Sequence, residues 1–287
     1  MTAGLFFGLT TVDIFNVVPR HPPANQKIKA EHQAVCAGGP AANAAVAFSA
    51  LGNDARLVSG LGSHPMAGIA DADLRRQGVT LFDYARDPDE LPILSSIIID
   101  ASNGDRCVVY ANPYSKWLRP DISHGELLQG CRVALFDGFY LEQAVAIARA
   151  ARERSVITVL DGGSWKDGLD ELLAFIDFAV CSEDFLPPGS TSVDQVLAFL
   201  TDRGISSGAV SRGGKPIISA AAGNRTDIPV PCIDAVDTLG AGDILHGAFC
   251  HYIIDHPFTE SLQLAARVAS QSCRYRGTRE WINYLQP

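Results

Sequence analysis

The sequence predicts an α/β protein with a mostly parallel central sheet and one small additional β-sheet. Short apolar runs alternate with longer segments of helical periodicity over most of the 287 residues, which is the rhythm of βαβ units. Several apolar runs end in glycine-rich or acidic turns, where open α/β sheets bind their ligands. Two stretches, residues 12–36 and 93–111, break the alternation and indicate the additional sheet.

The first half of the chain begins with a strand-like run, GLFFGLT. A helix is expected for PAANAAVAFSALG, which follows Gly38-Gly39 and stops at Gly52, a glycine of the kind that ends helices. The chain is then expected to return as a strand in ARLVSGLG. A second helix is expected in MAGIADADLRRQG, ending at Gly78.

The second half contains three further strand-like runs, RVALFDG, SVITVLDGG and FIDFAVCSED, each ending in a polar or glycine-rich turn. A connecting helix is predicted between the first two, because Leu141, Val145, Ala148 and Ala151 recur at helical spacing. In a parallel sheet the polar ends of these strands lie at one edge, so we expect the ligands there.

The two irregular stretches predict a lid. Residues 12–36 are Pro-rich and extended, and residues 93–111 alternate around Asn103-Gly104, a strong hairpin signal. We expect the two stretches to pair as a small sheet at the ligand edge. Because no repeat, low-complexity tract or linker divides the chain, residues 1–287 are expected to form one domain with this lid. The edge of the lid sheet could pair with a second copy as a homodimer.

Composition and charge argue against several classes of function. A net charge of −9 argues against nucleic-acid binding and anionic membranes, because both need clustered Lys and Arg. The longest apolar runs are shorter than a membrane span, and the start of the chain lacks the basic region of a signal peptide. The seven cysteines are scattered without a CxxC pair and are expected to be reduced, which favours the cytoplasm.

The sequence Gly240-Ala241-Gly242-Asp243 lies where a turn becomes an apolar, helix-like segment. Free backbone N–H groups at a helix start suit phosphate oxygens, and small residues let those oxygens come close. Asp243 can accept a proton from a hydroxyl that lies against the phosphate. This pattern favours phosphoryl transfer. A glycine turn with an N-capping aspartate is the structural alternative.

The motif DTLGAGD, with the earlier GGPAANAA, resembles the two signatures of the ribokinase-like carbohydrate kinases, also called the pfkB family. The C-terminal signature, Asp-Thr-x-Gly-Ala-Gly-Asp, is matched at every fixed position. The resemblance spans essentially the whole chain and implies a three-layer α/β/α sandwich with a β-sheet lid. It also implies an ATP-dependent sugar kinase that uses Mg²⁺, while dependence on a monovalent cation stays open.

The resemblance implies roles for residues of the C-terminal motif. Asp243 would deprotonate the sugar hydroxyl, and residues 240–242 would form the anion hole for the transferring γ-phosphoryl group. Asp237 and Thr238 begin the motif on the nucleotide side. Asp237 is expected to order the loop rather than to act as a second base.

On the acceptor side, the resemblance implies that Asp13 holds sugar hydroxyls and that Asn43 contacts the substrate. Gly38 and Gly39 match the diglycine at which the lid hinges. Lys27 in the first lid segment is either a contact for an anionic substrate group or a solvated lysine. The resemblance also implies a candidate contact at Asp161, because relatives place residues around the phosphate or sugar at this strand end.

Two family features are altered in this chain. The family often has Asn-x-x-Glu where this chain has CSED, so Asp184 or the adjacent Glu183 is expected to help hold Mg²⁺. The nucleotide strand usually ends in Gly-x-x-Gly, whereas SRGGKP keeps Gly213 but has Pro216 at the second glycine. Arg212 is either a phosphate contact or a solvated arginine.

The acceptor stays open at the level of sequence. A nucleoside kinase or a phosphosugar kinase would use the same machinery, the first favoured by lid aromatics and the second by a working Lys27. A sugar-sensing protein without turnover is the alternative outside the enzymes. The first lid segment and VLDGG look similar to the sulfofructose kinase branch, but Gly138-Phe139-Tyr140 supplies no arginine for a sulfonate, so that substrate is not expected.

Overall fold

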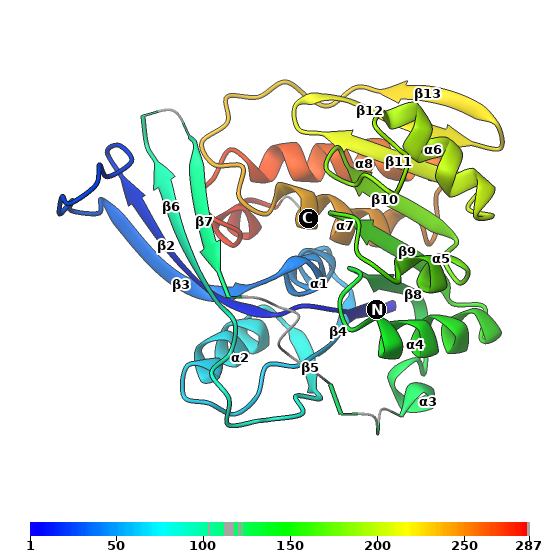
Figure 1. Ribbon diagram of the computed structural model, residues 1–287, viewed down its shortest axis with the longest axis horizontal. Coiled ribbons are helices and arrows are strands. Elements are labelled where there is room, and N and C mark those ends of the chain that lie inside the picture. Colours follow the sequence, from blue (N-terminus) through cyan, green and yellow to red (C-terminus); the bar gives the residue numbers. More distant parts are fainter. Residues whose placement is uncertain (103, 112–117, 120, 122, 286–287) are drawn as a thin grey trace.

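The computed structural model describes residues 1–102, 104–111, 118–119, 121 and 123–285. Its main sheet has nine strands, which are β1 (Ala3–Phe7), β4 (Asp54–Ser59), β5 (Val79–Asp83), β8 (Cys131–Phe136), β9 (Ile157–Gly162), β10 (Phe178–Ser182), β11 (Ser207–Arg212), β12 (Lys215–Ala221) and β13 (Asn224–Ile228). Their spatial order is β13-β12-β11-β10-β9-β8-β1-β4-β5 (Figure 1). Two of its strand pairs are antiparallel, β11 with β12 and β12 with β13, and the other pairs are parallel, so the sheet is mostly parallel, as predicted.

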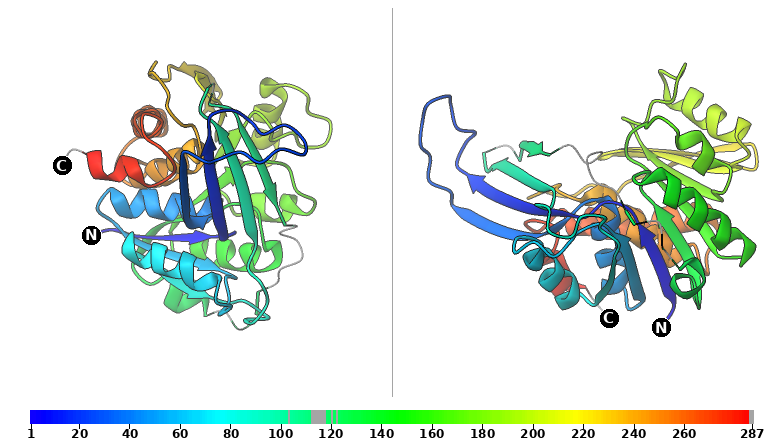
Figure 2. Two further views of the ribbon diagram at one scale, coloured as in Figure 1. Left: turned by 90° about the vertical axis from the view of Figure 1, so that its left-hand side faces the viewer. Right: turned by 60° about the horizontal axis from the view of Figure 1, so that its bottom comes forward.

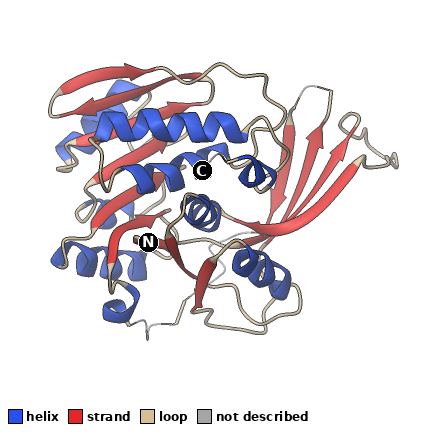
Figure 3. Ribbon diagram, turned by 180° about the vertical axis from the view of Figure 1, so that it is seen from behind, coloured by secondary structure: helices blue, strands red, loops and turns tan. Residues whose placement is uncertain are grey.

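Helices cover both faces of the main sheet, which gives three layers (Figures 1 and 3). One face carries α1 (Pro40–Ala50), α2 (Ala67–Arg76), α7 (Ala241–Tyr252) and α8 (Phe258–Ser272), and the other carries α3 (His124–Leu127), α4 (Leu141–Glu153), α5 (Leu169–Leu173) and α6 (Val193–Asp202). A short 3-10 helix, η2 (Glu280–Tyr284), follows α8. Within the described residues, no helix combines the length and apolar character of a membrane span.

The core is divided by the sheet because successive strand side chains point to opposite faces. In the central strand β1, Phe6 packs into the cluster under α1 and α7, whereas Leu5 and Phe7 pack into the cluster under α4. All three side chains are fully buried. A strand that is apolar on both faces is typical of a parallel sheet covered by helices on each side. The predicted α/β/α fold is therefore confirmed.

A second sheet of four strands projects from the main body (Figure 2). It contains β2 (Thr11–Val18), β3 (His32–Gly38), β6 (Leu94–Asp100) and β7 (Arg106–Tyr110), in the order β3-β2-β6-β7. β2 pairs with β6 in parallel, so the two irregular sequence stretches do form one sheet. β6 and β7 pair antiparallel, as the predicted hairpin requires, although Asn103 lies outside the described residues.

The connections place two segments at one edge of the main sheet. Gly38 and Gly39 join the second sheet to the start of α1, and residues 240–243 form the start of α7. Gly247 lets these helices pack closely, because a Cβ at this position would lie 2.2 Å from the carbonyl oxygen of Ala44 in α1. The starts of α1 and α7 are thereby held beside the polar ends of β8, β9 and β10.

Candidate active site

The start of α7 has the geometry expected of an anion hole. Gly240 precedes the helix with a φ of 69°, and a Cβ there would lie 2.5 Å from Cγ2 of Thr278, so both backbone and packing require glycine. By helical geometry the N–H groups of Gly242 and Asp243 have no acceptor inside the helix. A Cβ on Gly242 would meet nothing within 4 Å, so the space in front of these donors is open.

Asp243 lies in the first turn of α7. The sequence analysis placed it at the junction between the preceding loop and the helix, so the helix begins slightly earlier than expected. Nδ2 of Asn43 donates a 2.8 Å hydrogen bond to its Oδ2. Burial, followed by the charge of Asp161, raises the pKa of Asp243 to about 7, while the bond from Asn43 and the charge of His246 act in the opposite direction. A carboxyl that titrates near neutral pH suits general-base catalysis.

The raised pKa of Asp243 predicts how stability depends on pH. Because the folded protein binds this proton more tightly than the unfolded chain, the stabilisation is present below pH 4 and is lost as the pH rises to about 7. Asp243→Asn removes a desolvated carboxylate, so it should raise the Tm by roughly 2–6 °C at pH 8 and by much less at pH 5. Calorimetry at both pH values measures this difference. An equal shift at both would contradict it.

Asp13 faces Asp243 from the second sheet. It lies in β2, where Oγ1 of Thr11 donates a 2.6 Å hydrogen bond to its Oδ1, and burial raises its pKa. A Cβ on Gly38 would lie 2.0 Å from Oδ2 of Asp13, so the carboxylate rests directly on the backbone of that glycine. The charge of Asp13 also acts on the pKa of Asp243. The two aspartates therefore belong to one site.

The diglycine before α1 is required by close backbone approach. Gly39 has a φ of 96°, and a Cβ there would lie 2.4 Å from the carbonyl oxygen of Leu9. Together with Gly38, it lets β3 end against β2 and turn at once into α1. The predicted hinge motion at Gly38 and Gly39 stays a prediction, but the geometry explains why both positions are glycine.

Asn43 is held from both sides by a network that the sequence analysis missed. Nη1 of Arg279 donates to Oδ1 of Asn43 at 2.9 Å, which leaves its Nδ2 to bind Asp243. The same guanidinium contacts Oδ2 of Asp73 at 3.1 Å and the carbonyl oxygen of Ala37 at 2.7 Å. The substrate contact predicted for Asn43 stays a prediction; its observed role is to fix the Asp243 carboxylate.

Arg279 should therefore matter for stability. Arg279→Ala removes the nearer cation of the Asp73 carboxylate, which is 6% exposed, and leaves it the exposed Arg76 at 3.7 Å. Removing one partner of a buried ion pair costs up to about 3–5 kcal/mol. Urea unfolding should show this loss in the free energy of unfolding. The matched control is Arg274→Ala, which truncates an exposed arginine five residues earlier and should change little. Equal unfolding midpoints for both variants would refute the proposed importance of the network.

A second pair that the sequence analysis missed is Asp137, directly after β8, and Lys166, in the loop between β9 and α5. Oδ2 of Asp137 accepts hydrogen bonds from the backbone N–H groups of Leu9 (2.8 Å) and Ala41 (3.3 Å), so it caps the start of α1. Burial raises its pKa to about 6. Nζ of Lys166 donates to the carbonyl oxygen of Asp137 at 3.1 Å and lies 4.6 Å from the ring centroid of Phe139. An aspartate directly after an apolar strand was the available signal.

Asp161 lies near the end of β9 and is turned toward α7. Its side chain is buried, and its Oδ2 lies 3.4 Å from Nδ1 of His246. Its charge contributes to the raised pKa of Asp243. The structure thus brings Asp161 to the site, but the contact to sugar or phosphate predicted for it remains untested.

The loop before α7 is ordered by Asp237. Its Oδ1 accepts from the N–H of Leu239 at 2.9 Å and its Oδ2 from the N–H of Gly277 at 2.8 Å. The neighbouring Thr238 accepts a 2.8 Å hydrogen bond from Nη1 of Arg106 in β7. The second sheet therefore contacts the DTLGAGD loop directly.

The predicted nucleotide and metal residues lie at the ends of β10 and β11. Gly213 forms the turn between β11 and β12 with a φ of 60°, and Arg212 donates through Nε and Nη2 to the carbonyl oxygen of Pro216. A phosphate contact by Arg212 would compete with these bonds.

The predicted metal ligands, Glu183 and Asp184, are exposed at the end of β10, and Glu183 lies 3.7 Å from Nζ of Lys215. Among the described residues, no group of three His, Cys, Asp or Glu side chains could hold a metal ion. The carboxylates of Glu183 and Asp184 fit a Mg²⁺ that keeps several waters and is bound mainly through substrate phosphates. Mg²⁺ commonly uses only one or two protein carboxylates.

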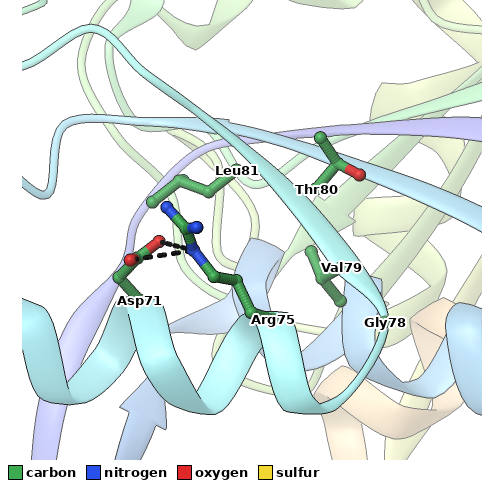
Figure 4. A pocket seen from close by; sticks show the side chains of 6 residues that line it. All are labelled: Asp71, Arg75, Gly78, Val79, Thr80 and Leu81. Atoms are coloured by element: carbon green, nitrogen blue, oxygen red, sulfur yellow. Dashed lines mark hydrogen bonds and ion pairs between the residues drawn. The ribbon is translucent and has the colours of Figure 1, made fainter.

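Two features lie away from this cluster. Lys27 is exposed in the loop between β2 and β3, so its predicted substrate contact stays a prediction. A hollow of about 440 Å³ lies beside the edge strand β5 (Figure 4). Its lining residues are Asp71, Arg75, Gly78, Val79, Thr80 and Leu81, and Asp71 forms an ion pair with Arg75 in it. None of them was predicted as a site residue.

Comparison with known proteins matches residues 1–283 to the model of the pfkB family carbohydrate kinases. Deoxyribokinase of Salmonella typhi is 22% identical, over 94% of this chain and 92% of its own length. A crystal structure from Agrobacterium tumefaciens, provisionally assigned as a ribokinase, has a TM-score of 0.87 at 23% identity and covers 99% of this chain and 98% of its own. Arabidopsis thaliana ribokinase, solved with ribose and ATP, has a TM-score of 0.74 at 20% identity, with coverage of 96% and 93%.

Proposed function

Since the chain belongs to the pfkB family of carbohydrate kinases, it is a phosphotransferase with an alcohol group as acceptor, and we propose that it transfers the γ-phosphoryl group of ATP to a primary hydroxyl of a sugar. The observation that carries this proposal is the start of α7. Open backbone donors at Gly242 and Asp243 lie beside a carboxylate whose pKa is raised to about 7. Phosphoryl transfer needs these two elements, charge stabilisation and a base that orients the nucleophile.

In the proposed reaction, Asp243 takes the proton of the sugar hydroxyl while the hydroxyl oxygen bonds to the γ-phosphorus. The bond from the γ-phosphorus to the bridging oxygen breaks, and ADP leaves. The N–H groups at the start of α7 stabilise the charge on the transferring group. Asn43 keeps the Asp243 carboxylate oriented through the 2.8 Å hydrogen bond to its Oδ2.

The sugar is proposed to lie between Asp13, the start of α1 and the start of α7. Asp13 is 7% exposed, and its charge acts on Asp243, so hydroxyls bound by Asp13 would lie close to the base. The second sheet is proposed to close over this space as a lid. Its contact from Arg106 to Thr238 supports this role, because it joins the lid to the loop that precedes the anion hole. Closure would exclude water, which competes as acceptor.

ATP is proposed to lie over the ends of β10 and β11, with its γ-phosphate at the start of α7. Glu183 or Asp184 at the end of β10 would hold Mg²⁺ through water. When bound, the metal ion neutralises charge on the phosphates. Asp237 and Thr238 border this space and shape the loop through their contacts to Gly277 and Arg106.

The first test is ADP release from MgATP with a panel of acceptors. Because relatives of this chain carry the names ribokinase and deoxyribokinase, aldopentoses come first, followed by ketohexoses, nucleosides and sugar phosphates. Turnover with a free sugar supports the proposal. Turnover confined to sugar phosphates would favour the phosphosugar alternative, for which Lys27 in the loop between β2 and β3 is the predicted contact. Sugars that raise the Tm without any turnover would favour a sensing protein.

The second sheet also predicts the oligomeric state. Its edge strand β7 exposes Val109 and Tyr110, at 66% and 60%, and unprotected apolar edge strands tend to pair. We expect a homodimer through this sheet, and Val109→Lys should shift it toward the monomer. Light scattering at micromolar concentration measures both masses. A monomeric wild type would contradict the expectation.

A further inference from the structure

His246 lies one turn after Asp243 in α7, and both of its ring nitrogens contact backbone carbonyl oxygens. Nδ1 is 2.7 Å from the oxygen of Gly242, and Nε2 is 2.8 Å from the oxygen of Val180 in β10. Carbonyl oxygens only accept hydrogen bonds, so a neutral ring would direct a nitrogen lone pair at one of them. Only the doubly protonated imidazolium donates to both.

The charge of such an imidazolium has a partner in Asp161. Oδ2 of Asp161 lies 3.4 Å from Nδ1 of His246, and both side chains are only 5% exposed. Within the described residues, this oxygen has no hydrogen-bond partner, so no other donor is within reach of it. A buried charge is tolerated when it is paired with an opposite charge. An imidazolium at His246 and a carboxylate at Asp161 would compensate each other in this way.

Other ionisable groups surround the pair. The groups that interact electrostatically with Asp161 include Asp137 directly after β8, on which Lys166 also acts, Cys181 from β10, and Asp243 and Cys250 from α7. Asp13 from β2 also acts on Asp243. Burial raises the pKa of both thiols well above neutral, so they carry no charge at physiological pH. Two carboxylates, Asp161 and Asp13, raise the pKa of Asp243, whereas the hydrogen bond from Asn43 and the charge of His246 lower it.

We propose that His246 is a positioning residue for phosphoryl transfer, an imidazolium that keeps Asp243 ionised and polarises the peptide between Gly242 and Asp243. The hydrogen bond from Nδ1 to the oxygen of Gly242 draws electron density from the N–H of Asp243, which is a donor of the anion hole. Its positive charge lowers the pKa of Asp243 against the effects of burial and of Asp161. The proposal rests on the role of Asp243 as the base.

The test measures the protonation of Asp243 directly, by NMR titration of its ¹³C-labelled carboxyl group. His246→Gln keeps one donor but removes the charge, so the Asp243 midpoint should rise by roughly one pH unit or more. The matched control is His251→Gln on the same helix, whose wild-type side chain is half-buried beside Asn53. Burial lowers the pKa of His251, so its loss removes no charge at neutral pH. An unchanged midpoint in His246→Gln would overturn the proposal.

Two further readouts separate the outcomes. In the wild-type protein, ¹⁵N NMR should find both nitrogens of His246 protonated at pH 7, and a neutral ring would refute the inference even if His246→Gln fails to fold. In sugar phosphorylation, His246→Gln should move the acid limb of the kcat profile to higher pH, whereas a purely structural role would lower kcat equally at every pH. If the wild type phosphorylates no sugar, the proposed function fails, while the two NMR measurements still decide the state of His246 and its effect on Asp243.

Discussion

Asp243→Asn is expected to lower kcat for sugar phosphorylation by about 10²–10⁴-fold, the usual contribution of a general base. The asparagine can still accept the hydrogen bond from Nδ2 of Asn43, so the site should keep its shape. Because the substitution removes only the proton acceptor, KM for ATP should change little. Steady-state kinetics with a saturating acceptor measure both constants.

The matched control for this variant is Asp234→Asn, which removes an exposed carboxylate from the loop before α7. It changes the net charge by the same amount and should keep wild-type kcat. If Asp243→Asn retained more than about a tenth of the activity, general-base catalysis by this residue would be contradicted. A similar loss in both variants would point to the loop rather than to the base.

Gly242→Ala is expected to lower kcat by about 10²–10³-fold without destabilising the protein, the scale for loss of one oxyanion-hole donor. The added Cβ would meet nothing within 4 Å in the protein, so the helix accepts it. The methyl group would instead occupy the open space in which phosphate oxygens approach the N–H groups. Glycine costs a helix about 1 kcal/mol relative to alanine, so the Tm should stay equal or rise.

Gly68→Ala is the control for this substitution because Gly68 is the second residue of α2, as Gly242 is of α7. A Cβ there also meets nothing within 4 Å, so the two variants share the same local change. Gly68→Ala should keep full activity. If Gly242→Ala were equally active, the phosphate would have to bind elsewhere, and the anion-hole assignment would be wrong.

The start of α7 could be predicted from the sequence because its signal is local. Gly240, Gly242 and Asp243 lie within four consecutive positions, and the backbone donors follow from helix geometry alone. The second sheet could be predicted for a similar reason. Its segments interrupt a regular alternation of strands and helices, and the turn signal near Gly104 predicts the antiparallel pairing of β6 with β7.

The network that holds the site could not be predicted in this way, because its contacts join distant parts of the chain. Arg279 binds Asn43 across 236 positions, and Asp137 accepts from Leu9 across 128. Neither residue belongs to a motif that was recognised. The contact of His246 with the carbonyl oxygen of Val180 in β10 likewise spans 66 positions. Such partners become visible only when the fold brings the strand ends together.

The central claim is that this chain moves a phosphoryl group from ATP to a sugar hydroxyl, and ³¹P NMR of the reaction tests it most directly. With MgATP, an aldopentose and wild-type protein, the account predicts a phosphate monoester signal that proton coupling to a primary carbon splits into a triplet. The same mixture with Asp243→Asn should give almost none. Inorganic phosphate as the only product, or equal monoester formation by both proteins, would contradict the account.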